Sequence, residues 1–264
     1  MIKNVLTIAG SDPSGGAGIQ ADLKTFSALG CYGMAALTAL TAQNTQEVRG
    51  FVAVPPEFIT DQLSAIFEDI EVSAVKIGML ANANIIKAVS AALKKYTAKN
   101  IVLDPVMVST SGDNLIDRDA VDALKEHLIP MADLLTPNIP EAEKLSRKAV
   151  LEMEVAAQGL LGLGANAVLL KGGHLKEEVA RDVLATATGC ELFESPRIDT
   201  QNTHGTGCTL SSAIAAYLAH GHDIVTACGN AKVFLTQALE HADNLNVGQG
   251  HGPVNHNYMS KIYE

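Results

Sequence analysis

The chain has 264 residues, a length that suits one large domain or two small ones. Hydrophobic residues make up 47% of it and charged residues only 18%, so it can bury a sizeable core and a disordered chain is excluded. Its 19 Lys and Arg residues are outnumbered by 29 Asp and Glu residues, and the net charge of -10 argues against nucleic acid or an anionic membrane as a partner.

The predicted elements alternate between short apolar strands and longer helical segments. The chain begins with three strands, each followed by a helix: strands at Val5–Ala9, Met34–Ala42 and Ala74–Met79, and helices at Ile19–Leu29, Pro55 to about Ile70 and Asn82 to about Lys95. The middle of the chain has predicted strands at Ile101–Val106, Asp133–Thr136 and Ala167–Leu170. A helix at Asp117–Leu128 separates the first two, and helices at Pro140–Leu145 and Glu152–Leu163 separate the last two. A hairpin and two helices end the chain: strands Val183–Ala187 and Leu192–Phe193 joined at Gly189–Cys190, then helices over about Thr209–His220 and Asp223–Asn244.

This alternation predicts an α/β fold, with a parallel sheet covered by helices on both faces. No stretch rich in Pro, Gly or Ser interrupts it, so a single domain over residues 1–264 is expected.

The four cysteines lack the spacing of a metal or redox site. Cys31, Cys190, Cys208 and Cys228 contain no C-x-x-C pair, and four in a chain of this length do not form a disulfide scaffold. The first apolar run is too short for a signal peptide, and no stretch approaches the 18 apolar residues of a membrane helix. We therefore expect a cytoplasmic protein.

Ligands of such a fold bind beyond the carboxyl ends of the strands, so the loops that follow strands are the candidate sites. The first is Gly10–Gly18, whose glycines let backbone N–H groups approach a ligand closely. It matches neither the dinucleotide-binding fingerprint nor the P-loop. A tight strand-to-helix turn explains this loop as well as ligand binding does.

A second candidate is Thr203–Thr209, directly before a predicted helix. Gly205 and Gly207 free the backbone where the helix N-terminus supplies partial positive charge, a combination that stabilises a transferring phosphoryl group. Cys208 sits where the helix starts, so we expect a lowered thiol pKa and a thiolate able to accept a proton from a substrate hydroxyl. A lone cysteine is more commonly a small buried hydrophobe, but the flanking glycines favour a functional role.

Further polar residues follow other strands. Lys171 precedes two glycines and can reach phosphate oxygens, although a solvated loop lysine is the more common case. Asn138 and Glu141 are three residues apart at a helix start, where they can bind a hydrated Mg²⁺ or simply cap the helix. Asp104 ends a strand, where it can orient a metal or substrate or cap a turn.

Together these parts are what phosphoryl transfer needs, and the sequence resembles the ribokinase-like kinases. Within them it is similar to the hydroxymethylpyrimidine/phosphomethylpyrimidine kinases of thiamin biosynthesis. The resemblance covers nearly the whole chain and rests on ordered matches at Ala9–Asp22, Thr41–Asn44, Lys76–Leu80, Val102–Met107, Thr136–Glu141, Lys171–His174, Asn202–Thr209 and Gly248–His256.

The resemblance implies a three-layer α/β/α sandwich with a central, mainly parallel sheet and a small β flap, commonly in a homodimer. It implies that ATP phosphorylates 4-amino-5-hydroxymethyl-2-methylpyrimidine and then its monophosphate. The pyrimidine would lie near Ala17, Asp22, Gln43, Met79 and Val106. Gln43 would pair its amide with the aminopyrimidine edge, because an amide offers both a donor and an acceptor.

On the nucleotide side, the resemblance places phosphate contacts on Lys171, Asn138 and Thr206, and Mg²⁺ on Asn138 and Glu141 through water, with Asp104 nearby. The Gly205–Cys208 loop, including Gly207, would form the anion hole. Most sugar kinases of the superfamily end this loop in Asp, whereas this chain has Cys. A thiol is the weaker base, so anion stabilisation by the loop backbone is the firmer assignment.

Two other functions stay open at the level of sequence. A pyridoxal kinase has the same loop and also phosphorylates a flat heteroaromatic alcohol. A non-catalytic pyrimidine sensor would have lost part of the site, whereas every part is intact here. A lid could come from the loop Ser109–Asp113 or from the flap at about Arg181–Glu194.

Overall fold

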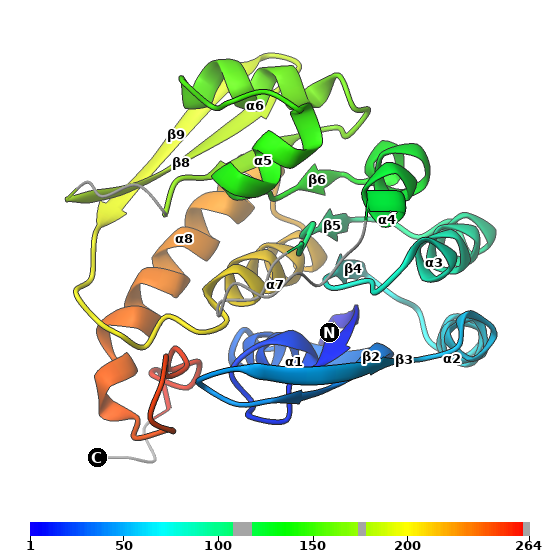
Figure 1. The fold of residues 1–264 in the computed structure, drawn as a ribbon, viewed down its shortest axis with the longest axis horizontal. Helices are drawn as coiled ribbons and strands as arrows, with labels where there is room; N and C mark the ends of the chain where they lie inside the picture. The colour runs from blue at the N-terminus through cyan, green and yellow to red at the C-terminus, as the bar shows by residue number, and fades with distance from the viewer. Residues whose placement is uncertain (108–117, 174–177, 261–264) are drawn as a thin grey trace.

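A nine-stranded sheet forms the centre of the molecule (Figure 1). The computed structural model describes residues 1–107, 118–173 and 178–260. The strand order is β3-β2-β1-β4-β5-β6-β7-β8-β9. The bounds are β1 Asn4–Ser11, β2 Tyr32–Gln43, β3 Val48–Ala53, β4 Ala74–Ile77, β5 Ile101–Leu103, β6 Leu134–Leu135, β7 Val168–Lys171, β8 Val179–Thr186 and β9 Gly189–Pro196.

The sheet is mainly parallel, as the alternation of elements predicts. The six strands from β2 to β7 pair in parallel, whereas β3 at one edge and the β8–β9 hairpin at the other are antiparallel. The carboxyl ends of the parallel strands therefore lie at one end of the sheet, where ligands bind in α/β proteins.

Helices cover both faces of the sheet (Figure 1). One face carries α1, α7 and α8, and the other carries α2 to α6. The bounds are α1 Gly18–Ala28, α2 Pro56–Phe67, α3 Ala83–Lys95, α4 Arg118–Ala123, α5 Ile139–Ser146, α6 Met153–Leu161, α7 Thr206–Ala219 and α8 Ile224–Glu240.

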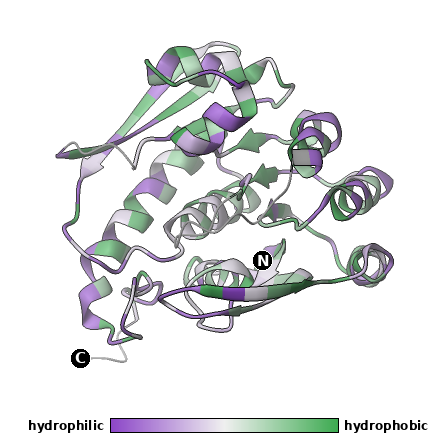
Figure 2. Cartoon of the chain, viewed as in Figure 1, coloured by the Kyte–Doolittle hydropathy of each residue, from purple (hydrophilic) through white to green (hydrophobic). Residues whose placement is uncertain are grey.

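Two hydrophobic cores result, one on each face. Successive side chains of a strand point to opposite faces, so on β1 Val5 enters the core beneath α7 whereas Leu6 and Ile8 enter the core beneath α2 and α3. The short central strands are hydrophobic along their length, whereas the outer helices mix hydrophobic and hydrophilic residues (Figure 2). This is the pattern of a parallel sheet buried on both sides.

The sequence patterns miss or misplace some elements. Strand β3 is not predicted, because most of its residues are exposed and show no alternation of buried and exposed positions. The hairpin turn lies at Ala187–Thr188, and Gly189–Cys190 begins β9 instead of forming the turn. Strands β4 and β5 end two or three residues before the predicted bounds, because the chain there leaves the sheet toward the candidate site.

Three expectations fall on residues outside the described ranges: the start of a helix at Asp117, the lid segment Ser109–Asp113 and the position of His174. Among the described residues, none of the helices is both long and apolar enough to cross a bilayer.

Candidate active site

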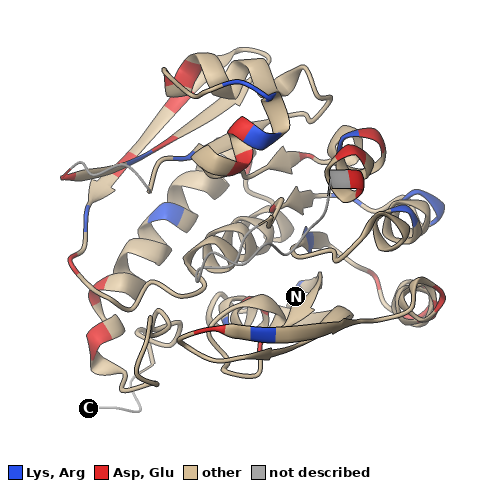
Figure 3. Ribbon diagram, in the orientation of Figure 1, with Lys and Arg blue, Asp and Glu red and all other residues tan. Residues whose placement is uncertain are grey.

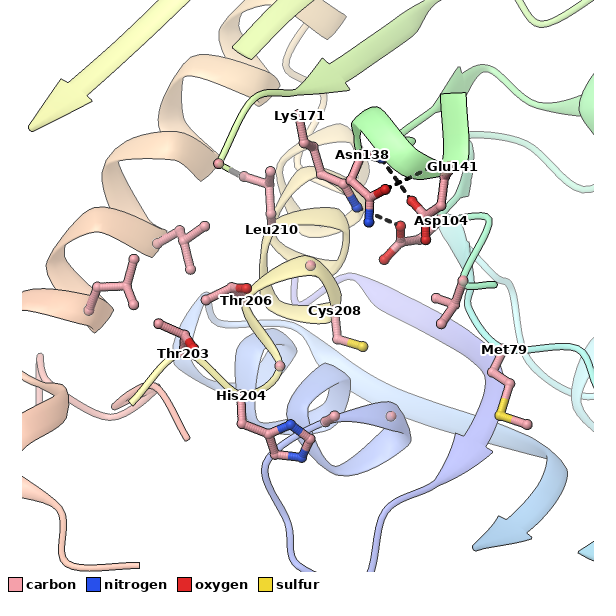
Figure 4. A pocket seen from close by; sticks show the side chains of 18 of the residues that line it. Met79, Asp104, Asn138, Glu141, Lys171, Thr203, His204, Thr206, Cys208 and Leu210 are labelled. Carbon is pink, nitrogen blue, oxygen red and sulfur yellow. Dashed lines mark hydrogen bonds and ion pairs between the residues drawn. The ribbon is translucent and has the colours of Figure 1, made fainter. Parts of the chain in front are cut away.

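A cavity of about 610 Å³ opens at the carboxyl ends of the parallel strands. It extends from the loop after β1 to the first turn of α7 and on to one face of α8. Figure 4 shows the side chains that point into it. All but one of the residues that the sequence singles out line it: Ala17, Gln43, Met79, Asp104, Val106, Asn138, Glu141, Lys171, Gly205, Thr206, Gly207 and Cys208.

Asp12 organises the first glycine loop. One of its carboxylate oxygens accepts hydrogen bonds from the Ser14 N–H at 2.9 Å and the Ser14 hydroxyl at 2.7 Å. The other accepts from the N–H groups of Gly16 and Ala17, at 3.1 and 2.8 Å. His204 Nε2 lies 2.9 Å from the same oxygen. Burial raises the pKa of Asp12, but the hydrogen bonds from His204, Ser14 and Ala17 outweigh it and lower the pKa below its usual range.

The two glycine loops lie directly against each other. A Cβ atom on Gly205 would lie 1.9 Å from the Gly16 carbonyl oxygen, and one on Gly16 would lie 2.2 Å from the His204 ring. Gly205 is the N-cap of α7 and has a φ of 78°, in the left-handed region that favours glycine. The approach of the two loops brings the first turn of α7 beside the N-terminus of α1.

Substituting Gly205 with Ala tests this contact. Gly30 supplies a matched control, because its φ of 73° is similar but nothing lies within 4 Å of a Cβ built there. Gly30→Ala should lower the free energy of unfolding by about 1 kcal/mol through backbone strain alone. Gly205→Ala adds the clash with Gly16 and should cost about 2–4 kcal/mol. Urea unfolding measures both; equal costs would show that the loops separate easily.

Cys208 lies in the first turn of α7 and points into the cavity (Figure 4). The expectation of a lowered thiol pKa is wrong. Burial raises the pKa of Cys208 to about 11, and the nearby charge of Lys76 and the N–H of Gly18 lower it by less. The helix N-terminus is present, but removal from water disfavours the thiolate more strongly.

Lys171 forms an ion pair in the cavity wall. Its Nζ lies 2.8 Å from Asp104 Oδ1, and both side chains are largely buried. Burial lowers the pKa of Lys171, but the negative charges of Asp104 and Glu141 raise it by more, so the amine is an ammonium at neutral pH. A Cβ atom on Gly207 would lie 3.4 Å from this Nζ. Lys171 therefore faces the first turn of α7 across the cavity (Figure 4).

Asn138 and Glu141 form a capping box at the start of α5. The Asn138 side chain accepts from the Glu141 N–H at 2.9 Å, and Glu141 Oε2 accepts from the Asn138 N–H at 2.8 Å. Capping therefore occupies these two oxygens. Burial raises the pKa of Glu141 to about 7, against the lowering effect of the Lys171 charge. Among the described residues, no cluster of three or more His, Cys, Asp or Glu side chains could hold a metal ion by itself.

Asp22 is the exception among the predicted site residues: it does not line the cavity. It is completely buried, and its carboxylate accepts bonds from Lys76 at 2.9 Å, Thr7 at 2.6 Å and Ser212 at 2.7 Å. The prediction that it contacts the pyrimidine is therefore corrected, because its oxygens are already occupied. Asp22 instead holds Lys76, which reaches the cavity wall from β4.

A second ion pair lies at the far end of the cavity, where α8 passes β8. Lys232 Nζ lies 2.6 Å from Asp182 Oδ2, and Asp182 Oδ1 accepts from the Gly172 N–H at 3.0 Å. Lys232 is buried, and Figure 3 shows that the part of α8 around its basic residue is otherwise neutral. The surrounding wall is largely apolar, with Leu210, Ile198, Leu235 and Leu239.

Sequence reasoning missed Asp12, His204, Lys232 and Asp182. Asp12 and His204 lie inside the two glycine motifs, so their location was a signal, but nothing in the spacing shows that residues 192 positions apart form a pair. Lys232 carried a weaker signal: a charged residue in a helix that is otherwise apolar at that turn.

Comparison with known proteins identifies relatives across almost the whole chain. A family model described as phosphomethylpyrimidine kinase matches residues 12–255. The hydroxymethylpyrimidine/phosphomethylpyrimidine kinase of Escherichia coli is 50% identical over 257 residues, which cover 96% of this chain and 97% of that protein. The thiamine biosynthesis bifunctional protein ThiED of Geobacter sulfurreducens is 54% identical over 256 residues, and the chain spans 52% of its length.

A solved structure shares the fold. The ADP complex of Bacillus subtilis pyridoxal kinase superposes with a TM-score of 0.89 at 40% identity, covering 98% of this chain and 99% of that one. The mixed, mostly parallel open sheet is thus that of the pyridoxal kinase and ribokinase-like α/β proteins.

Proposed function

The chain belongs to the phosphomethylpyrimidine kinase family, and on this premise we propose how its cavity performs two successive phosphorylations. ATP phosphorylates the hydroxymethyl group of 4-amino-5-hydroxymethyl-2-methylpyrimidine, and a second ATP converts the monophosphate to the diphosphate. The observation that carries the proposal is that the N-terminus of α7 and the Lys171 ammonium face each other across one cavity.

The Gly205–Cys208 loop, called the anion site below, stabilises the transferring phosphoryl group. The N–H groups of Gly205, Gly207 and Cys208 lie at the start of α7, where no carbonyl of the same helix pairs with them, whereas the Thr206 N–H donates to the Thr203 carbonyl at 3.3 Å. Together with the helix dipole, the N–H groups of Gly205, Gly207 and Cys208 stabilise the negative charge on the equatorial oxygens of the transferring phosphoryl group. Lys171 adds a positive charge from the opposite wall and binds the nucleotide phosphates. The apolar far end of the cavity suits the base and ribose.

Between Met79 and Val106, the other end of the cavity suits the pyrimidine ring. These side chains supply apolar walls, and Ala17 leaves room beside the first glycine loop. Gln43 pairs its amide with the aminopyrimidine edge, whose amino group donates and whose ring nitrogen accepts. The substrate hydroxymethyl group then points toward Cys208 and the anion site.

Cys208 acts as the base for the first transfer only. A hydroxyl must lose its proton to become a phosphate ester, whereas the monophosphate already carries a negative oxygen. Because the pKa of the thiol is about 11, only a small fraction is thiolate at neutral pH. Phosphoryl transfer has a loose transition state, so late and incomplete deprotonation suffices.

The residues present fit a hydrated Mg²⁺. Glu141 and Asp104 supply carboxylate oxygens, the donors that this ion prefers, and Asn138 lies beside them. With two oxygens engaged in the capping box, the protein would hold the ion partly through water and the nucleotide phosphates. When bound, Mg²⁺ neutralises phosphate charge.

Pyridoxal phosphorylation is the alternative, because the pyridoxal kinase of Bacillus subtilis superposes closely. An assay with ATP and Mg²⁺ on the hydroxymethylpyrimidine, its monophosphate and pyridoxal, with products resolved, decides between them. We expect turnover of both pyrimidines and little of pyridoxal. Fast pyridoxal phosphorylation without diphosphate formation would assign the chain to vitamin B6 salvage, and turnover of none of the three would reject the proposal.

A further inference from the structure

We propose that the C-terminal segment Gly248–His256 is a positioning element of the active site. It joins the turn between β2 and β3 to the loop that leads into the anion site, and so fixes two walls of the cavity relative to each other. The structure describes this whole segment, and none of its residues lines the cavity. The inference rests on the proposed function, because it takes Gln43 as the pyrimidine contact and the Gly205–Cys208 loop as the place of transfer.

One part of the segment contacts the turn between β2 and β3. The Gly250 N–H donates to Thr45 Oγ1 at 3.1 Å, and the His251 N–H donates to the Thr45 carbonyl at 2.9 Å. A Cβ atom on Gly250 would lie 2.2 Å from that carbonyl oxygen, so the two backbones touch and only glycine fits. Thr45 is two residues beyond Gln43, the last residue of β2. A displacement of Thr45 therefore moves the strand end that carries the Gln43 amide.

Another part of the segment contacts the loop before α7. The backbone N–H of His204 donates to the Gly252 carbonyl at 2.9 Å, and His204 pairs with Pro253 in a parallel bridge. A Cβ atom on Gly252 would lie 1.9 Å from Asn202 Oδ1. Gly205, the N-cap of α7, directly follows His204. The segment therefore sets the path by which the chain enters the anion site.

Two helices anchor the segment, which is drawn in red beside the end of α8 in Figure 1. The Asn255 N–H donates to the Ala238 carbonyl of α8 at 3.0 Å, and His256 Nε2 lies 2.9 Å from Thr209 Oγ1 of α7. Both His256 and Thr209 are buried. Because these anchors lie in helices of the core, a methyl group added to one of the segment's glycines should displace the facing loop more than the segment itself.

The test uses the two glycines as separate probes of the two contacts. Gly250→Ala displaces Thr45 and should raise KM for the hydroxymethylpyrimidine about fivefold to tenfold, the loss of one hydrogen bond, with kcat within about twofold. Gly252→Ala displaces the loop before α7 and should lower kcat about tenfold or more for both phosphorylation steps, because transfer requires exact placement of the anion site. Its KM for the hydroxymethylpyrimidine should stay within about twofold.

A rescue distinguishes positioning from loss of folding. The clash at Gly252 involves the Asn202 side chain, so Asn202→Ala combined with Gly252→Ala should return kcat to that of Asn202→Ala alone. Thr45→Val removes an acceptor without adding a clash and should raise KM for the hydroxymethylpyrimidine about threefold. Gly159→Ala serves as the control, because nothing lies within 4 Å of a Cβ built there. Melting temperatures check that each variant folds.

Three outcomes would overturn the inference. Folded variants that keep wild-type KM and kcat, or that share the same loss of kcat, would show that the segment only stabilises the fold. A Thr45→Val protein with unchanged KM would reject the link to Gln43 even if Gly250→Ala failed to fold. A wild-type protein that phosphorylates neither pyrimidine would instead reject the proposed function, and the inference with it.

Discussion

Replacing Lys171 by Met should lower kcat for both phosphorylation steps about a thousandfold, because it removes the positive charge that faces the anion site across the cavity. The amine keeps its proton at neutral pH, so its charge acts on the ground state and on the transition state alike. The stronger effect falls on kcat because negative charge moves toward the bridging oxygen during transfer. Single-turnover rates on the hydroxymethylpyrimidine and on its monophosphate measure the two steps separately.

The same substitution leaves Asp104 without its cation, which for a buried pair costs about 3–5 kcal/mol of unfolding free energy. Lys171→Met combined with Asp104→Asn removes both charges and should restore most of the stability without restoring activity. Lys87→Met on the exposed side of α3 serves as the control for charge removal alone. A folded Lys171→Met protein with more than a tenth of wild-type kcat would contradict the role given to this lysine.

The second large effect should come from Cys208→Ala. We expect the first step to fall about a hundredfold, the usual contribution of a general base, and the second step by no more than about threefold. Because the pKa of the thiol is about 11, its thiolate fraction rises tenfold per pH unit between pH 7 and 9. The first-step rate of the wild type should therefore rise with pH over this range and become flat in Cys208→Ala.

Two controls make the result specific to Cys208. The second step should be nearly independent of pH in both proteins, since the acceptor is already an anion. Cys190→Ala, at an exposed cysteine in β9, should leave both steps unchanged. If Cys208→Ala slowed both steps equally, the base role would be rejected and the cysteine would only shape the loop.

Much of the fold follows from signals between near neighbours in the sequence. The alternation of apolar runs predicts the parallel strands β1, β2 and β4 to β7, and all of these except β2 are buried on both faces. Asn82 was predicted to cap α3, and its side chain accepts from the Ile85 N–H at 3.0 Å. Strand β3 escaped prediction because an exposed edge strand imposes little pattern on its residues.

In the candidate site, too, some features follow from near neighbours in the sequence and others depend on residues far away in it. The glycine motifs, Lys171 and the Asn138–Glu141 spacing mark the site, since each reflects a local backbone requirement at the end of a strand. The hydrogen bonds and ion pairs of the site residues depend on partners that are far away in the sequence. Asp22 meets Lys76 across 54 residues, which removes it from the substrate contacts, and His204 meets Asp12 across 192.

Cys208 illustrates the physical reason most clearly. Its position at a helix N-terminus is local and was read correctly from the sequence, and by itself this position lowers a thiol pKa. Its burial, and the charges of Asp22 and Asp104 nearby, come from other strands and from α1, and together they raise the pKa instead. Sequence alone thus determined most of the elements, the motifs and the family, because these depend on backbone geometry and short spacings. Only the tertiary structure decided the protonation states and the partners, because desolvation and Coulomb interactions depend on distance in space.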